Sequence, residues 1–80
     1  MALPLEAVPN FSEGRDAAVV KAIGRALAER AELLDVHVDA DHNRSVFTLV
    51  GEADELVAAL LAGIAVARSS SHGADRKSVV

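Results

Sequence analysis

The chain has 80 residues, which suffice for one small domain and exclude a second folded one. Apolar residues make up 51% of it, but the only aromatic ones are two phenylalanines, so Val, Leu, Ile and Ala must fill most of the core. Twelve acidic against eight basic side chains give a formal charge of −4, without a dense Lys/Arg cluster, which argues against nucleic acid as a partner.

Cysteine content and hydropathy argue against export and against a membrane. The absence of cysteine removes disulfides, thiolate nucleophiles and thiolate metal sites, and it fits a reducing compartment. Residues 1–10 lack a positively charged start and contain two prolines, which is not typical of a signal peptide. The longest apolar run, residues 56–67, is shorter than the roughly 20 residues of a membrane span. We therefore expect a cytoplasmic protein without a membrane partner.

The first part of the chain predicts an edge strand and then an amphipathic helix. Residues 3–11 carry apolar side chains and two prolines, which is typical of an edge strand that leads into a loop. Asp16 is a good N-cap at the end of that loop. Apolar residues then recur at helical spacing to about Arg30. The expected apolar stripe consists of Val19, Val20, Ile23, Leu27 and Ala31.

Residues 33–51 predict a β-hairpin. Over residues 33–39 the pattern has a period of two, which is typical of a half-buried strand. It places Leu34, Val36 and Val38 on one side and Asp35, His37 and Asp39 on the other. A polar connection at 41–44 leads to a run rich in β-branched residues at 45–50, which ends at Gly51.

The last predicted element is a helix from about residue 52 to residue 68. Glu52, Asp54 and Glu55 at its start and Arg68 near its end match the polarity of a helix dipole. Residues 56–67 contain no charge, so a sheet, a neighbouring subunit or a missing part of the chain must cover most of this helix. Residues 69–80 are polar and aperiodic. We therefore expect a structured unit over 1–68 and a disordered tail over 69–80.

The predicted order is strand, helix, strand, strand, helix. This order defines an α+β fold class, a ferredoxin-like split βαβ unit (βαββα) whose final strand is missing or atypical.

Two separated blocks of the sequence resemble the formiminotransferase (glutamate formimidoyltransferase) family. The first block is VPNFSEGR at residues 8–15, and the second is LLDV at 33–36 with NRSVFTLVG at 43–51. Blocks of this length arise by chance far less readily than a lone glycine motif. The resemblance covers roughly residues 5–68 and implies the N-terminal member of a pair of ferredoxin-like subdomains, with folate in the groove between them.

The resemblance implies a transferase that moves a formimino group from formiminoglutamate to its co-substrate tetrahydrofolate, in histidine degradation and one-carbon metabolism. The family's catalytic histidine lies after the second helix in an HxGEHPR segment, and a strand that completes the sheet follows. His72 stands near the right distance, but residues 74–76 do not reproduce the motif, so no catalytic role is assigned to His72. We therefore expect a truncated, frame-shifted or divergent chain that is inactive alone and lacks its C-terminal subdomain.

Six residues are the expected lining of a polar substrate groove. They are Asn10, Ser12, Asp35, His37, Asn43 and Arg44. Asp35 and His37 share a strand face beside the turn, Arg44 offers a planar fork for a substrate carboxylate, and Asn43 can donate and accept. The resemblance supports Asn43 and Arg44. The alternative is a solvated strand face for Asp35 and His37, and a turn or capping role for Asn10 and Ser12.

Two other interpretations remain open. The chain could be a non-catalytic module that binds folate or pairs with a second copy through its sheet edge and apolar helix. The string Asp35, His37, Asp39, Asp41 and His42 contains residue types that bind metals. Because a strand points its side chains one way and the turn residues need not converge with them, no metal site is assigned.

Overall fold

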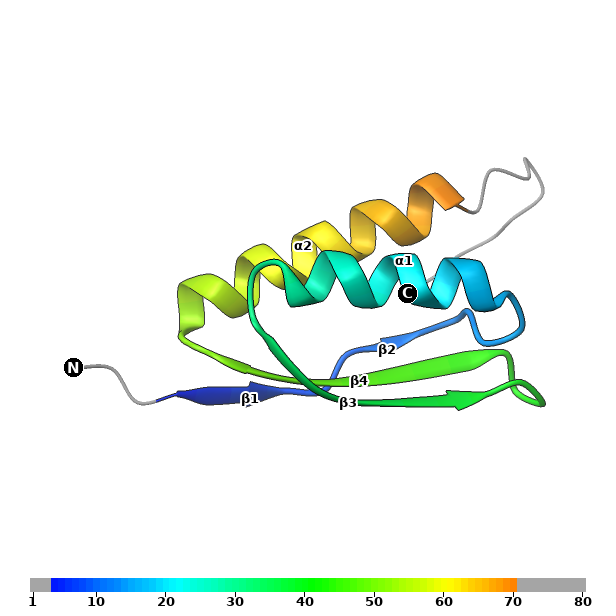
Figure 1. The fold of residues 1–80 in the computed structure, drawn as a ribbon, viewed down its shortest axis with the longest axis horizontal. Coiled ribbons are helices and arrows are strands. Elements are labelled where there is room, and N and C mark those ends of the chain that lie inside the picture. Colours follow the sequence, from blue (N-terminus) through cyan, green and yellow to red (C-terminus); the bar gives the residue numbers. More distant parts are fainter. Residues whose placement is uncertain (1–3, 71–80) are drawn as a thin grey trace.

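The computed structural model describes residues 4–70, which form a four-stranded antiparallel sheet with two helices. The elements are β1 (Leu5–Ala7), β2 (Asn10–Phe11), α1 (Ala17–Ala28), β3 (Glu32–Asp39), β4 (Arg44–Gly51) and α2 (Ala53–Ser70). β4 is central, with β1 and β2 along one side and β3 along the other. Both helices lie on the same face of the sheet (Figure 1). The predicted ferredoxin-like α+β class is confirmed.

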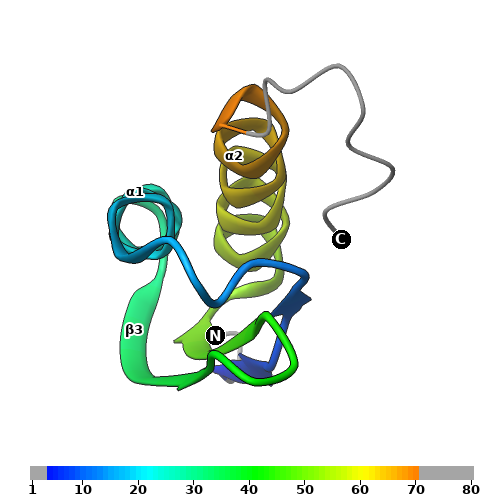
Figure 2. The ribbon, with the colours of Figure 1, turned by 90° about the vertical axis from the view of Figure 1, so that its right-hand side faces the viewer.

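The second face of the sheet, which we call the outer face, carries no helix among the described residues. Figure 2 shows the molecule end-on, with α1 and α2 side by side above the strands. α2 continues to Ser70, two residues beyond its predicted end. The tail expected to be disordered therefore lies, from residue 71 onward, outside the described residues.

The predicted first strand is divided into β1 and β2 by Val8 and Pro9. Ala7 pairs with Leu49, and Asn10 pairs with Val46. From the first pair to the second, the edge advances three residues and the antiparallel β4 goes back three, so the register is the same on both sides of the break. Pro9 has no N–H to donate, but its carbonyl accepts a hydrogen bond of 3.0 Å from the backbone N–H of Phe47. The edge thus stays attached to β4 across the proline.

Helix α1 begins where the sequence places its cap. The Oδ1 atom of Asp16 accepts hydrogen bonds from the backbone N–H groups of Ala18 (3.0 Å) and Val19 (3.3 Å), two of the donors that a helix start leaves without partners. The stripe residues Val20, Ile23 and Leu27 are buried, whereas Val19 and Ala31 are only partly covered.

The hairpin of β3 and β4 is confirmed, with one correction. Leu33 pairs with Leu49 and Asp35 pairs with Thr48, which leaves Leu34 as an extra residue in a β-bulge. The predicted alternation therefore breaks at Leu34, and Leu33, which pairs with the buried Leu49, lies on the helix-facing side with Val36 and Val38. Leu34 is 54% exposed.

The remaining alternation of β3 is as predicted. Val36 and Val38 pair with the buried residues Phe47 and Ser45, so they lie on the helix-facing side. Asp35, His37 and Asp39 consequently share the outer face.

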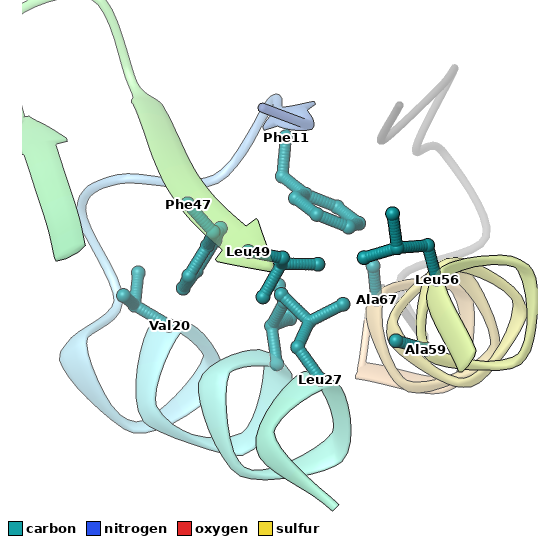
Figure 3. Packing of buried hydrophobic residues seen from close by; sticks show 9 residues of the cluster. Phe11, Val20, Leu27, Phe47, Leu49, Leu56, Ala59 and Ala67 are labelled. Carbon is teal, nitrogen blue, oxygen red and sulfur yellow. The ribbon is translucent and has the colours of Figure 1, made fainter. Parts of the chain in front are cut away.

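The core lies between the helices and the inner face of β4 (Figure 3). Phe11, Ile23, Leu27, Phe47 and Leu49 are almost fully buried in it. The rings of Phe11 and Phe47 meet edge to face, with centroids 5.6 Å apart and planes at 84°. From α2 come Leu56, Ala59 and Ala67. The two phenylalanines are thus surrounded by aliphatic side chains, as the composition requires.

Helix α2 is not covered all round by the described residues. Val57 and Leu61, one turn apart, are 57% and 63% exposed. No helix within residues 4–70 has the length and hydropathy needed to cross a membrane.

Replacement by alanine should change the stability of the protein in opposite directions at two glycines that lie in helices. A Cβ at Gly24 of α1 would meet no atom closer than 3.6 Å, whereas a Cβ at Gly63 of α2 would lie 2.7 Å from Cδ2 of Leu27 and 3.2 Å from Cζ of Phe11, both buried. Alanine gains about 1 kcal/mol over glycine in a helix, while overpacking costs about 1–3 kcal/mol. In urea denaturation, Gly24→Ala should raise the free energy of unfolding by up to about 1 kcal/mol, and Gly63→Ala should lower it by about 1 kcal/mol. Equal stabilisation by both would contradict the close packing of α2.

Candidate functional site

Three of the expected groove residues lie in adjacent rows on the outer face. Asn10 of β2 and His37 of β3 both pair with Val46 of β4, so they flank one residue of the central strand. Asp35 pairs with Thr48 in the next row. Because neighbouring strands lie about 4.8 Å apart, Asn10 and His37 are separated by about 10 Å. All three predicted side chains are exposed.

The central strand provides a less polar strip between these rows. Val46, Thr48 and Val50 of β4 alternate with the buried Ser45, Phe47 and Leu49, so they lie on the outer face. They are only half-buried, because no described element covers them. An apolar strip bordered by hydrogen-bonding groups is a surface on which a flat ligand can lie.

Arg44 stands at the hairpin end of the outer face. It pairs with Asp39 across the hairpin and precedes the inward-facing Ser45, which places its side chain on the outer side. Within residues 4–70 the guanidinium makes no hydrogen bond or ion pair, so its N–H donors are open to a ligand.

The amide oxygen of Asn43 is used within the protein. Asn43 has a φ of 52°, a left-handed conformation that asparagine tolerates better than most residues. Its Oδ1 atom accepts hydrogen bonds from the backbone N–H groups of Gly14 (2.9 Å) and Arg15 (3.1 Å). Asn43 therefore has a structural task at the position where a substrate contact is expected.

Asn10 and Ser12 stand on either side of the buried Phe11. The side-chain nitrogen of Asn10 donates a 3.2 Å hydrogen bond to the carbonyl of Val8. Ser12 is exposed in the loop between β2 and α1, two residues before Gly14. The pairing of Asn10 places it with His37, and no pairing places Ser12 in that row.

An aspartate and a histidine form a pair at the hairpin turn that the sequence analysis did not identify. The carboxylate of Asp39 lies 2.7 Å from Nδ1 of His42 and also accepts a 3.2 Å hydrogen bond from the backbone N–H of His42. The hydrogen bond with the His42 side chain, followed by the one with its backbone, lowers the pKa of Asp39 below its usual 3.8. Aspartate in a turn often accepts a hydrogen bond from a backbone N–H a few residues away, so the sequence does contain a local signal for this contact.

The contacts of Arg15 with the same turn were also missed. Its Nε donates to the carbonyl of Ala40 (2.9 Å) and its Nη2 donates to the carbonyl of Asp41 (3.2 Å). Backbone acceptors 25 and 26 residues away leave no signal in the sequence.

The residue types that suggest metal ligands are spread out. Among residues 4–70, no group of three or more histidine, aspartate or glutamate side chains is arranged to hold a metal ion. Asp39 and His42 contact each other, while Asp35 and His37 lie along β3. The described arrangement offers hydrogen bonds and charges to a polar ligand.

Comparison with known proteins matches the residues that the structure describes to one family. Residues 4–71 match the family described as the formiminotransferase domain, N-terminal subdomain. The chain is 48% identical over 65 residues to a glutamate formimidoyltransferase of Thermoplasma acidophilum, which covers 79% of this chain and 22% of that protein. It is 42% identical over 69 residues to a formimidoyltransferase-cyclodeaminase of Gallus gallus, which covers 84% of this chain and 13% of that one.

A bacterial relative gives the same result. A glutamate formimidoyltransferase of Streptococcus pyogenes serotype M1 is 48% identical over 54 residues, which covers 65% of this chain and 18% of that protein. The chain therefore spans only between 13% and 22% of the length of these three relatives.

The Asp39–His42 contact predicts the acid titration of one carboxyl group. Because the pKa of Asp39 is lowered in the folded state, the contribution of this pair to stability is present above pH 3.8 and is lost as the pH falls through the folded pKa. The Cγ resonance of Asp39, followed by NMR, should titrate below pH 3.8, and His42→Ala should move its midpoint toward that value. His37→Ala is the control and should leave it in place. The same midpoint in wild type and His42→Ala would contradict the pairing.

Proposed function

This chain belongs to the formiminotransferase-domain N-terminal subdomain family, and on that premise we propose that it forms one wall of the substrate groove of a glutamate formimidoyltransferase. The proposed reaction moves a formimino group from formiminoglutamate to tetrahydrofolate, in histidine degradation and one-carbon metabolism in the cytoplasm. Two relatives that carry the name glutamate formimidoyltransferase support it, each at 48% identity.

The open outer face of the sheet is the observation that carries this proposal. Both helices pack on the other face, so the outer face is the side on which the described sheet can meet a ligand or a second subdomain (Figure 2). It presents Asn10, Asp35 and His37 in adjacent rows, and Arg44 at its hairpin end. A polar face with a guanidinium that has no partner among residues 4–70 suits a substrate that carries carboxylates and an amidine.

Each residue has a definite part in the proposal. The guanidinium of Arg44 forms a bidentate pair with a carboxylate of formiminoglutamate. Asp35 and His37 on one side and Asn10 on the other hydrogen-bond to polar groups of the ligand. The folate ring system lies on the strip of Val46, Thr48 and Val50, whose half-buried surface supplies apolar contact. Ser12 and Asn43 act at the rim, where Asn43 also holds the turn.

Formimino transfer needs a group that moves protons. The folate nitrogen must lose a proton as it attacks the amidine carbon, and the departing glutamate nitrogen must gain one. We assign this proton transfer and the opposite wall of the groove to the region that the relatives have beyond the matched residues. We infer that the 80 residues alone are inactive and bind folate at most weakly, because one wall buries too little of the ligand.

Removal of the Arg44 guanidinium tests this assignment. The test uses a polypeptide that also contains the region which the relatives have beyond the matched residues, and we call it the complete polypeptide. In it, Arg44→Ala should lower kcat/KM for formiminoglutamate by about tenfold or more, because the charge-assisted hydrogen bonds of the bidentate pair are lost. The free energy of unfolding should stay within about 0.5 kcal/mol of wild type, since the side chain is exposed. Arg30→Ala, in the turn that follows α1, is the matched control for loss of an exposed arginine. An Arg44→Ala protein with full activity would refute the role.

The exposed side of α2 favours self-association as a second candidate function. Val57 and Leu61 present adjacent apolar surface on α2. The exposed Leu5 of β1 and Val8, in the break between β1 and β2, lie along the edge of the sheet away from β3. A second copy that covers these residues would bury them.

Sedimentation tests this second candidate. The 80-residue chain should sediment as a dimer at micromolar concentration, and Leu61→Asp should convert it to a monomer by placing a charge in the contact. Leu34→Asp is the matched control, since Leu34 is similarly exposed but lies on β3 at the opposite edge. A wild-type monomer, or a dimer that only Leu34→Asp dissociates, would rule out this interface.

A further inference from the structure

Two loops far apart in the sequence meet at one end of the molecule. The loop at residues 12–16 leads from β2 into α1, and the turn at 40–43 joins β3 to β4. Both lie at the end of the molecule where α1 begins (Figure 1). Their contact includes several hydrogen bonds and a close approach of the two backbones.

Four hydrogen bonds join the loop to the turn. The backbone N–H groups of Gly14 and Arg15 both donate to Oδ1 of Asn43. The guanidinium of Arg15 donates through Nε to the carbonyl of Ala40 and through Nη2 to the carbonyl of Asp41. We call Gly14, Arg15 and Asn43 the clasp.

The close approach of the two backbones depends on the absence of a side chain at Gly14. A Cβ atom at this position would lie 2.5 Å from both the N and the O atom of Arg44, and 2.8 Å from the carbonyl oxygen of Asp39. These are backbone atoms of paired strand residues, which cannot move aside without disturbing the hairpin. The loop therefore sits directly on the backbone of Arg44.

The clasp also stabilises an unusual backbone conformation. The turn has an internal hydrogen bond of 3.2 Å from the N–H of Asn43 to the carbonyl of Ala40, and that carbonyl also accepts from Arg15. Asn43 holds its left-handed φ of 52° next to Arg44 in the chain. Without the clasp, the exposed turn would keep only its internal hydrogen bonds, from Asn43 to Ala40 and between His42 and Asp39, to select this conformation over others.

We propose that Arg15 is a positioning residue, which through the clasp fixes the hairpin turn and thereby the direction of the Arg44 side chain on the outer face. The planar guanidinium of Arg15 is suited to this task because Nε and Nη2 reach the carbonyls of two consecutive residues at once. The N–H groups at Nε and Nη2 of Arg15 are thereby used in hydrogen bonds within the protein. The functional half of this inference rests on the proposed substrate contact of Arg44, whereas the clasp itself does not.

Amide exchange in the 80-residue chain tests the clasp without any substrate. Asn43→Asp keeps the acceptor, whereas Asn43→Gly removes it and still permits a positive φ. Exchange of the Gly14 and Arg15 amides should be about tenfold faster in Asn43→Gly than in Asn43→Asp, the effect of losing one hydrogen bond.

The Arg15 side chain is tested in the same experiment. Arg15→Ala should increase exchange of the Asn43 amide by about tenfold, with Arg15→Lys in between, because an ammonium lacks the fork. Arg25→Ala, an exposed arginine of α1, is the matched control and should leave these amides unchanged. Unaltered exchange in both Asn43→Gly and Arg15→Ala would overturn the clasp.

A double-mutant cycle in the complete polypeptide tests whether Arg15 acts through Arg44. Arg15→Ala should raise KM for formiminoglutamate by about tenfold with little change in kcat, since a binding group is misplaced. In the Arg44→Ala background the same change should have no further effect. A further loss of the same size in that background would show that Arg15 acts independently, and would overturn the positioning role. Absence of any formimino transfer by the wild type would count against the proposed function, while amide exchange would still decide the clasp.

Discussion

The alternation of side chains along β4 connects the core of this protein to its candidate site. β4 is the strand with which the other three strands of the described sheet pair, and its inward residues Phe47 and Leu49 are completely buried. Thr48, which lies between Phe47 and Leu49 in the sequence, and Val46, which precedes Phe47, therefore face outward. A slip of one residue would exchange the two faces, so the packing of the phenylalanine and leucine also fixes which polar residues of β2 and β3 share the outer face. The energy that holds the site in register comes from the opposite side of the sheet.

The same division explains why the site can be polar and open in a chain of this size. The two phenylalanines lie on the inner face of the sheet, where their rings meet edge to face in the core between the sheet and the helices (Figure 3). The outer face does not have to contribute a core of its own. Its residues are then free to serve a ligand or a second subdomain, and the exposed Leu61 on α2 shows that the helical layer also retains apolar surface to offer.

Local patterns predicted most of this fold from the sequence. The cap at Asp16, the stripe of α1 and the hairpin all depend on residues within one element or on neighbouring ones. The bulge at Leu34 could not be predicted, because LLDVHVD begins with two adjacent leucines and only pairing with β4 selects Leu33 as the inward one. For the site, the shared face of Asp35 and His37 followed from strand periodicity. The hydrogen bonds of Asn43 to Gly14 and Arg15 did not, since a backbone donor 28 or 29 residues away has no signature in side-chain type.

The two blocks that carry the family resemblance consequently mix two kinds of residue. Within them, Asn10 and Arg44 lie where a ligand can reach, while Gly14 and Asn43 are occupied in joining one block to the other. Residues of both kinds would matter to a ligand of Arg44. A movement of the turn displaces the Arg44 guanidinium, and a substitution of Arg44 removes it. Under the proposed function, the resemblance points to the region of the candidate site, and the contacts within it separate the groups that a ligand can reach from those that hold them in place.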